Sequence, residues 1–346
     1  MNKKIAAVAL SGGVDSAASA YILKQQGFEV FGITMKNFEN FDVEPAKYVA
    51  NKLNIKHYVV DLVKIFEKEI INEFVNEYVT GKTPNPCMMC NKKIKYGYLL
   101  KEAKNLGAEF LATGHYAKIK YDDENNIYKL FKSNAKRKDQ TYFLYHLNQA
   151  KLSSVIFPLE SYENKLQVRE LVKNIVPETF EKKDSLNICF IQNMSHSLFI
   201  KKRLNLINDK GNFIDKNGKF IAKHKGIYNY TIGQKRGLGI KGEKPNFVVK
   251  INPKTNEITL GDDIDTYKEK INIVDVSFID ESKFKLNSFE CEVKLCQWGY
   301  FIPCTVYNNE NKTASIKFHK AERAPASGQS AVFYHGDEII GGGTII

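Results

Sequence analysis

The stretch Ser11-Gly-Gly-Val-Asp-Ser16 predicts the fold of the N-terminal part of this chain through its two flanks. The apolar run Ile5–Leu10 before it is typical of a buried parallel strand, and the segment 17–26 after it is typical of a helix. A strand, a tight glycine turn and a helix N-terminus together form an anion site, because unpaired backbone N–H groups and the helix dipole converge there. The stretch therefore indicates a loop that binds the phosphates of a nucleotide.

The loop lacks the motifs of two common classes of nucleotide site, which limits the kind of nucleotide chemistry it can support. It has neither the Gly-Lys-Ser/Thr ending of a Walker loop nor the G-x-G-x-x-G fingerprint of a dinucleotide site. It resembles the pyrophosphate loop of the N-type ATP pyrophosphatases, which cleave ATP to AMP and pyrophosphate while adenylating a carbonyl oxygen. The hydroxyls of Ser11 and Ser16 can donate to the pyrophosphate, and Asp15 is placed to hold Mg²⁺. An ordinary glycine turn is the alternative, which the two serines and the aspartate in register disfavour.

Composition limits the class of protein. A chain of 346 residues, 43% of them hydrophobic, is typical of a globular protein of two or three domains. No apolar run approaches the roughly 20 residues that span a bilayer, and the Met-Asn-Lys-Lys start leads straight into the first strand without a signal peptide, so we expect a cytoplasmic protein with no membrane partner. Lys and Arg outnumber Asp and Glu by 51 to 39, which favours a polyanionic partner. Six cysteines in a cytosolic chain of this length are not a disulfide framework.

Strands and helices alternate through the first third of the chain, which predicts an α/β fold with a parallel sheet covered on both faces. The expected strands are 5–10, 30–35, 57–62 and 110–113, and the expected helices are 17–26, 43–53, 64–79 and 91–106. Ligands of such sheets bind at the carboxyl ends of the strands. Ser11, Met35 and Gly114 all lie at such ends, so we expect them to line one crevice, with the backbone around Met35 and Gly114 suited to an adenosine.

The segment Thr83-Pro-Asn-Pro-Cys-Met-Met-Cys-Asn91 carries two cysteines after a stiff double-proline turn. With the next helix expected to begin at Asn91, Cys90 lies at a helix N-terminus beside Lys92 and Lys93, and both features lower the pKa of a thiol. We therefore expect Cys90 to be reactive. A zinc half-site and a redox pair are the alternatives. A zinc site needs a second pair of ligands, and no matching Cys-x-x-Cys or His-x₃-His follows.

Two further residues have two interpretations each. His115, in Thr113-Gly-His-Tyr-Ala117, is either a functional histidine or one satisfied by local hydrogen bonds. Cys189 lies in the apolar, strand-like run 184–191, where a cysteine is most often a core residue.

From about residue 205 the pattern changes to short apolar runs separated by turns such as Asn208-Asp-Lys-Gly-Asn. The glycine-rich run Tyr230–Gly239 is either a phosphate-binding loop, through Lys235 and Arg236, or an ordinary ordered loop. After about residue 268 evenly spaced short strands predict a small β-barrel, in which we expect three cysteines to pack, Cys291, Cys296 and Cys304. The predicted domains are 1–204 (catalytic), 205–267 (central, β-rich) and 268–346 (barrel).

An ordered set of motifs across nearly the whole chain resembles the tRNA-specific 2-thiouridylase family. The motifs are Ser11–Ser16, Met35-Lys-Asn37, Thr83-Pro-Asn-Pro86, Cys90-Asn91, Gly114-His-Tyr-Ala117, Lys138-Asp-Gln140, Ile188-Cys-Phe-Ile191, Tyr230-Thr-Ile-Gly-Gln234, Arg236-Gly-Leu-Gly239, Pro325–Tyr334 and Gly341-Gly-Gly343. A single motif would be weak, but the ordered set is specific.

The resemblance implies ATP-dependent 2-thiolation of the wobble uridine, position 34, in the tRNAs for lysine, glutamate and glutamine. Adenylation turns the C2 oxygen of uracil into AMP, a good leaving group. By the resemblance, Cys189 carries a persulfide and Cys90 is the nucleophile, which leaves a transient Cys90–Cys189 disulfide. It also implies ATP and Mg²⁺ as cofactors, tRNA as substrate, and a sulfur donor that is a cysteine desulfurase or a sulfur-relay protein.

The resemblance also assigns binding residues. For ATP these are Ala9, Leu10, Ser11, Gly12, Gly13, Val14, Asp15, Ser16, Met35 and Gly114. For tRNA and its target base they are Asn85, Pro86, Cys87, His115, Lys138, Asp139, Gln140, Cys296, Gln297 and Gln329.

Two departures from the family pattern leave questions open. Cys87 stands where some members have an aspartate, which puts an acid–base role there in doubt and creates a set of three thiols with Cys90 and Cys189. Three thiolates can hold an iron–sulfur cluster, an alternative route for delivering sulfide. An Arg-Tyr pair that the family uses near tRNA aligns with Cys296-Gln297, so a charged contact is lost or moved there.

Two other functions stay open at this stage. Another pyrophosphatase-type enzyme, an amide-forming ligase for a small acid, would need neither the barrel, the basic balance nor a reactive cysteine pair. An RNA-binding module with a vestigial nucleotide loop would not need Ser11, Asp15 and Ser16 intact. The barrel, the charge and the intact loop therefore favour the tRNA sulfurtransferase.

Overall fold

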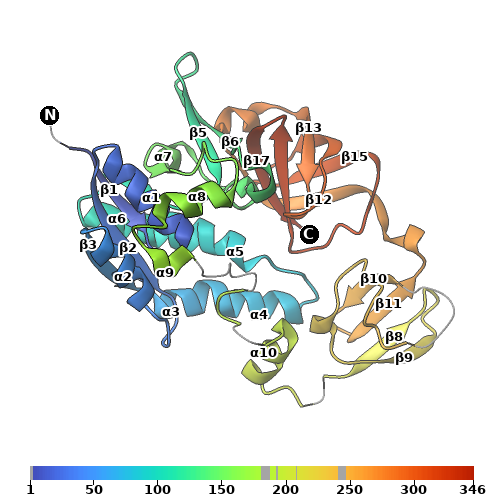
Figure 1. The fold of residues 1–346 in the computed structure, drawn as a ribbon. Helices are drawn as coiled ribbons and strands as arrows, with labels where there is room; N and C mark the ends of the chain where they lie inside the picture. The colour runs from blue at the N-terminus through green and yellow to red at the C-terminus, as the bar shows by residue number, and fades with distance from the viewer. Residues whose placement is uncertain (1–2, 181–187, 192–193, 208, 241–246) are drawn as a thin grey trace.

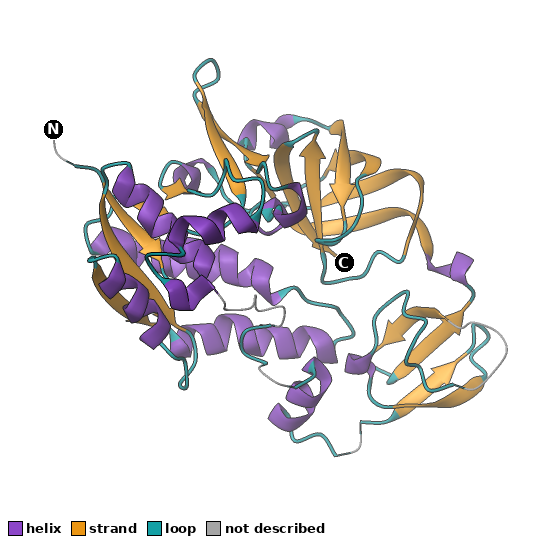
Figure 2. Ribbon diagram, viewed as in Figure 1, coloured by secondary structure: helices purple, strands orange, loops and turns teal. Residues whose placement is uncertain are grey.

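Figures 1 and 2 show the computed structural model of the chain, which describes residues 3–180, 188–191, 194–207, 209–240 and 247–346. An α/β part from the N-terminal half lies beside a C-terminal barrel, and a small central sheet lies below the barrel (Figure 1). The arrangement confirms the predicted α/β fold followed by a β-rich part and a β-barrel.

The N-terminal sheet has five parallel strands in the order β3-β2-β1-β4-β7. Four of them match the predicted strands to within one residue at either end, namely β1 (Ile5–Ala9), β2 (Glu29–Lys36), β3 (Lys56–Asp61) and β4 (Phe110–Ala112). The edge strand β7 (Val155–Ile156) was not predicted, because two residues carry no readable pattern.

Side chains of β1 alternate between the two faces of this sheet, as the two-residue period of a strand requires. Ala6 and Val8 pack with α1 (Val14–Gln25), α2 (Glu44–Lys52) and α8 (Lys165–Val172). Ala7 packs on the other face with the helix that follows Asn85. Both faces are covered, which explains why β1 is apolar throughout.

Two long helices lie between β3 and β4. The first comprises α3 (Val63–Phe66), a π-helical turn (Glu67–Ile71) and α4 (Asn72–Val79), and the second comprises α5 (Pro86–Met89), a π-helical stretch (Cys90–Leu99) and α6 (Leu100–Asn105).

The second helix begins at Pro86, so the prediction that it begins at Asn91 is wrong. The Asn85 side chain caps it by accepting a hydrogen bond from the Met88 backbone N–H at 3.3 Å. Proline is favoured at the first helical position because its φ is fixed and its missing N–H has no partner to lose there. Cys90 consequently lies about one turn inside the helix, not at its N-terminus.

The predicted strand-like run 184–191 is described only in part, since residues 184–187 lie outside the described residues, as does Asn208. Ile188–Ile191 forms a turn in which the Ile191 N–H donates to the Ile188 carbonyl at 3.1 Å. Cys189 is exposed at this turn, so its interpretation as a core residue is wrong. Phe190 and Ile191 are the buried residues of the segment.

Six C-terminal strands form a closed barrel, as predicted. They are β12 (Tyr267–Phe278), β13 (Ser288–Lys294), β14 (Ile302–Asn308), β15 (Ala314–Arg323), β16 (Ser330–His335) and β17 (Glu338–Ile345). The barrel closes because β12 pairs with both β15 and β17. Cys291 and Cys304 are buried opposite each other, whereas Cys296 is exposed, so its predicted packing is wrong.

A hairpin joins the N-terminal part to the barrel. It comprises β5 (Ala117–Asp122) and β6 (Ile127–Lys132), and β6 pairs with β17 through Phe131 opposite Glu338. The central sheet has the order β10-β11-β8-β9. Its strands are β8 (Gly211–Ile214), β9 (Phe220–His224), β10 (Phe247–Asn252) and β11 (Glu257–Gly261).

The other helices are short. They are α7 (Gln149–Leu152), α9 (Pro177–Phe180), α10 (His196–Arg203) and the 3₁₀ turns Lys136–Lys138, Thr141–Phe143, Ile227–Asn229, Asp263–Thr266 and Glu281–Lys285. Within the described part of the chain, no helix has the length and apolarity needed to cross a membrane.

Candidate active site

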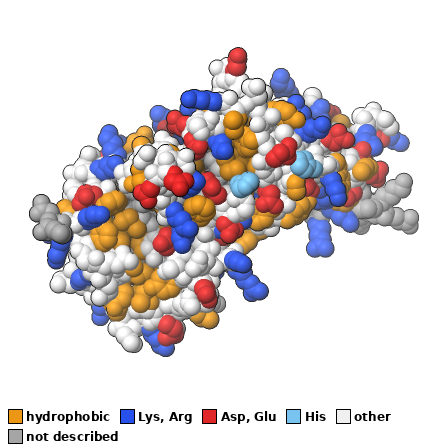
Figure 3. Space-filling view, turned by 90° about the horizontal axis from the view of Figure 1, so that it is seen from above, with side chains coloured by type: hydrophobic (Ala, Val, Ile, Leu, Met, Phe, Trp, Pro, Cys, Tyr) orange, Lys and Arg blue, Asp and Glu red, His pale blue; other side chains and the backbone are white. Residues whose placement is uncertain are grey.

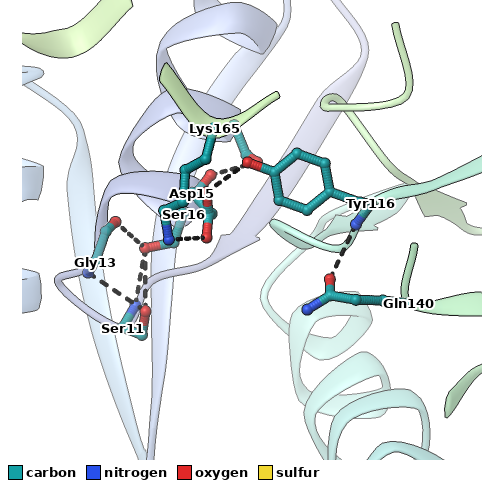
Figure 4. A network of polar contacts seen from close by, with 8 residues as sticks. Ser11, Gly13, Asp15, Ser16, Tyr116, Gln140 and Lys165 are labelled. Atoms are coloured by element: carbon teal, nitrogen blue, oxygen red, sulfur yellow. Dashed lines mark hydrogen bonds and ion pairs between the residues drawn. The ribbon is translucent and has the colours of Figure 1, made fainter. Parts of the chain in front are cut away.

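Hydrogen bonds among its own residues shape the loop Ser11–Ser16 (Figure 4). The Ser16 hydroxyl donates to the Gly13 carbonyl at 2.9 Å, and the Ser11 backbone N–H donates to Ser16 Oγ at 3.2 Å. Gly12 has a φ of +71°, and a Cβ there would lie 2.3 Å from the Cβ of Pro45. Only glycine fits this position, so the turn itself requires the first glycine of the motif.

Two residues to which the sequence gave no role hold the Asp15 carboxylate. Tyr116 Oη donates to Oδ1 and Lys165 Nζ donates to Oδ2, each at 2.9 Å (Figure 4). Lys165 opens α8, and its side chain is 17% exposed. Partial burial strengthens the attraction between these charges relative to a pair in open water. The carboxylate is therefore fixed in direction at the start of α1.

A pocket of about 660 Å³ adjoins this ion pair. Its lining includes the cationic residues Lys136, Arg137, Lys138 and Lys165. Because four positive side chains surround it, the pocket suits an anionic group. Lys138, which the sequence predicts to meet tRNA, is one of the four.

The other predicted ATP residues lie around the same strand ends. A Cβ on Gly114 would lie 2.8 Å from the Asp15 carbonyl carbon, so the chain after β4 passes directly against the loop. Ala9 ends β1, the Leu10 N–H donates to the Ile33 carbonyl at 2.9 Å, and Val14 begins α1. Met35 is half-buried near the end of β2. The expected convergence of three strand ends is thus present in the fold.

Burial controls the thiol of Cys90. Cys90 packs against the apolar cluster that contains Phe66, Ile94 and Phe190, and this burial raises the pKa of its thiol to about 12. Among the described residues the opposing charge is Lys95, which lowers the pKa. The predicted lowering of the Cys90 pKa is therefore wrong, because the thiol lies inside the helix rather than at a helix N-terminus.

The thiol of Cys189 lies near those of Cys87 and Cys90, although these two precede it by about 100 positions in the sequence. After burial, the neighbouring Cys189 and Cys87 thiols further raise the pKa of Cys90. Burial raises the pKa of Cys189 to about 11, and Cys87 again adds to the effect. Burial also raises the pKa of Cys87. Cys87 and Cys189 nevertheless reach solvent.

The described residues contain no group of three or more His, Cys, Asp or Glu side chains arranged to hold a metal ion. The proximity of Cys87, Cys90 and Cys189 therefore gives no support to an iron–sulfur cluster or to a zinc site.

The barrel holds the segment that precedes Cys87. Gln329 Nε2 donates to the Thr83 carbonyl at 2.9 Å, and the Thr83 N–H donates to the Ser327 carbonyl at 2.8 Å. Gly328 has a φ of +91°, and a Cβ there would lie 3.0 Å from the Thr83 backbone. Gln329 thus positions the Asn85-Pro86 turn in addition to any contact with tRNA.

A second group of predicted tRNA residues also meets across the two parts. Gln297 Nε2 donates to the Asp139 carbonyl at 2.6 Å, and Gln140 Oε1 accepts from the Tyr116 N–H at 3.0 Å. Cys296 is exposed beside Gln297. On the face seen in Figure 3, Lys and Arg side chains are interspersed with Asp and Glu rather than gathered in one patch.

His115 has the geometry of a satisfied structural histidine. It is 9% exposed, and its Nδ1 lies 2.8 Å from both Tyr96 Oη and Thr113 Oγ1. Burial holds its pKa well below the usual value, so the ring is neutral. The structure therefore favours the local hydrogen-bonding interpretation over a direct contact with the target base.

Three family models match successive parts of the chain. They are described as the tRNA methyl transferase HUP domain (residues 3–193), the tRNA methyl transferase PRC-barrel domain (197–262) and the aminomethyltransferase beta-barrel domain (268–345). The tRNA-specific 2-thiouridylase MnmA of Clostridioides difficile (strain 630) is 41% identical over 358 residues, covering 100% of this chain and 98% of that protein. The protein of the same name from Clostridium acetobutylicum is 40% identical over 359 residues, covering 100% of each.

Proposed function

We propose that this chain, which belongs to the tRNA-specific 2-thiouridylase family and is a tRNA sulfurtransferase, replaces the C2 oxygen of the wobble uridine, position 34, in the tRNAs for lysine, glutamate and glutamine. The proximity of Cys90 and Cys189, from segments 99 positions apart by their residue numbers (189 − 90), carries the proposal. A ligase for small acids needs no such pair.

In the first step the loop Ser11–Ser16 binds ATP. Its backbone N–H groups and serine hydroxyls donate to the phosphates, and Gly114 lets the chain after β4 pass directly against Asp15 of the loop. The uridine C2 oxygen attacks the α-phosphorus, pyrophosphate leaves, and the oxygen becomes part of an AMP ester. Lys165 and its cationic neighbours stabilise the negative charge that leaves.

Mg²⁺ fits this site through Asp15. The ion is usually held in proteins by one or two carboxylates together with substrate phosphates and water, so a single fixed carboxylate is a sufficient protein ligand. Bound there, Mg²⁺ would neutralise charge on the phosphates. Tyr116 holds the Asp15 carboxylate in place by donating to its Oδ1.

In the second step Cys189 carries the sulfur as a persulfide taken from a cysteine desulfurase or a sulfur-relay protein. The Cys90 thiolate attacks the Cys189 sulfur, the bond between the two persulfide sulfurs breaks, and HS⁻ leaves with the electron pair. HS⁻ adds to C2, and AMP leaves with the original oxygen. The Cys90–Cys189 disulfide that remains takes two electrons from a thiol reductant before the next turnover.

We assign adenylation and sulfur transfer to residues 1–204, and tRNA binding to the segments 205–267 and 268–346 as well. The Gln329–Thr83 and Gln297–Asp139 hydrogen bonds support this division of labour, because they connect the barrel to both predicted tRNA segments of the catalytic part.

The test is thiolation of unmodified tRNA transcript by the anaerobically purified chain with ATP, Mg²⁺, cysteine and a desulfurase. Cys90→Ser and Cys189→Ser should abolish 2-thiouridine and the disulfide seen by mass spectrometry. The matched control Cys87→Ser should retain both, because Cys87 takes no part in the exchange. Loss of activity in all three variants together with bound iron would replace the persulfide route by a cluster route. No thiolation by the unaltered chain would refute the proposed function.

A further inference from the structure

The loop 295–301 between β13 and β14 exposes two aromatic rings. Trp298, the only tryptophan of the chain, is 81% exposed, and Tyr300 is 65% exposed. Single exposed hydrophobic residues are ordinary on protein surfaces. Two large exposed rings within three residues are unusual, because each leaves a large apolar area in water. They indicate a partner that covers them.

Protein contacts hold this loop in place. Lys294 Nζ donates to the Gln297 carbonyl at 2.7 Å, and the Gly299 N–H donates to the Cys296 carbonyl at 3.1 Å. The Phe301 ring packs edge-on against Tyr334 with their centroids 5.1 Å apart. Trp298 is therefore presented on an ordered loop, and binding a partner there costs little additional ordering of the backbone.

Hydrogen bonds connect this loop to the nucleotide loop. Gln297 donates to the Asp139 carbonyl, and the next residue, Gln140, accepts from the Tyr116 N–H. Tyr116 in turn donates to the Asp15 carboxylate. These hydrogen bonds thus run from the proposed adenylation site to Gln297, and Trp298 is the next residue in the sequence. The aromatic loop and the proposed adenylation site thus belong to one hydrogen-bonded network.

The chemistry around the loop suits a nucleotide. Lys132 Nζ lies 3.9 Å from the centroid of Phe301, and Lys294 Nζ lies 5.3 Å from it, so positive charge borders the aromatic loop. The Tyr300 hydroxyl is bound by the Glu322 carboxylate, which fixes that ring. Trp298 has the larger and more exposed face. Aromatic side chains bind unpaired bases by stacking, whatever the base.

We propose that Trp298 is a stacking platform for an unpaired base of the tRNA anticodon loop, with Tyr300 flanking it. The proposal rests on tRNA thiolation as the function. It assigns to this chain an aromatic contact next to the exposed Cys296.

Because the chain has one tryptophan, its indole fluorescence reports this site alone. Titration with unmodified tRNA transcript, and with the isolated anticodon stem-loop, should quench the emission in a saturable manner. Filter binding run in parallel establishes saturation. Emission that stays unchanged at saturating tRNA would overturn the proposal. So would quenching by the desulfurase but not by tRNA, because the loop would then bind the sulfur donor.

Kinetics of variants test the same contact independently. Trp298→Ala should raise the KM for tRNA about 5- to 150-fold while kcat at saturating tRNA stays within about twofold, because a stacked base contributes to binding and not to the chemical step. Trp298→Phe should recover most of the loss.

The matched control is Tyr307→Ala, an exposed residue near the opposite end of β14, which should leave KM unchanged. A chain that does not thiolate tRNA at all refutes the proposed function. A chain that thiolates tRNA with the same KM before and after Trp298→Ala refutes only the stacking platform.

Discussion

Replacing Lys95 by methionine tests how the Cys90 thiol is controlled. Burial raises the pKa of this thiol to about 12 from an ordinary value of 9.0, and Lys95 acts against the rise. At pH 8 a thiol of pKa 12 is ionised to about one part in 10⁴, against about one part in ten for a pKa of 9, a difference of about 1000-fold. Methionine keeps the length of the side chain and removes its charge, so the thiolate fraction should fall further.

The assay is alkylation of Cys90 by iodoacetamide, followed by mass spectrometry of the peptide, from pH 7 to pH 10. Only the thiolate reacts. Since the pKa lies above this range, the rate should rise about tenfold per pH unit with no plateau, and Lys95→Met should be slower at each pH.

The matched control is Lys93→Met on the same helix, whose ammonium pairs with Glu69 Oε2 at 2.6 Å and which should leave the Cys90 rate unchanged. A plateau below pH 9 would contradict the effect of burial. Equal rates in the Lys95 and Lys93 variants would contradict the role of Lys95.

Three further predictions concern positions that hold the site together. Lys165→Gln should raise the KM for ATP about tenfold through loss of a charge-assisted bond, whereas Lys173→Gln at the end of the same helix should not; equal KM values would count against a phosphate role for Lys165. Gly114→Ala should abolish calorimetric ATP binding with the fold intact, because the methyl group would press on the Asp15 backbone; unimpaired binding would contradict that contact. Asn85→Ala should lower the free energy of unfolding by about 1 kcal/mol through loss of the helix cap, which urea unfolding measures, and an unchanged midpoint would disprove the cap's contribution.

The sequence predicted those strands and turns whose formation depends on residues close together in the chain. β1, β2 and β4 contain runs of buried apolar residues and the edge strand β3 contains the apolar run 58–60, so the apolar runs located all four to within a residue. The barrel strands were predicted for a similar reason, since short alternating runs separated by turns are typical of few structures other than β-barrels and sandwiches. The Ser11–Ser16 loop was readable because glycine and two serines in fixed register have a geometric meaning that Gly12 bears out.

Features that depend on contacts between residues far apart in the chain could not be predicted from the sequence. Tyr116 and Lys165 contact Asp15 from 101 and 150 residues away, and the residues around them in the sequence give no sign of these contacts. The pairing of β6 with β17 is of the same kind. The error on the Cys90 pKa also has this origin. Here burial raises the pKa of the Cys90 thiol by more than the neighbouring positive charge lowers it, and burial is decided by helices that lie elsewhere in the chain.

The contacts around Thr83 connect the barrel to the helix that carries Cys90, and they suggest what the high pKa of Cys90 is for. Thr83 is held by Ser327 and Gln329 of the barrel, and the stiff Pro84-Asn85-Pro86 turn leads from it into the helix that carries Cys90. If the barrel binds tRNA as proposed, that binding would act on the same segment that leads into the helix of Cys90. With its pKa raised to about 12, the Cys90 thiol is almost wholly protonated at neutral pH, and a protonated thiol is a poor nucleophile for the proposed persulfide. In the proposed mechanism this would keep sulfur on Cys189 until a tRNA changes the surroundings of Cys90.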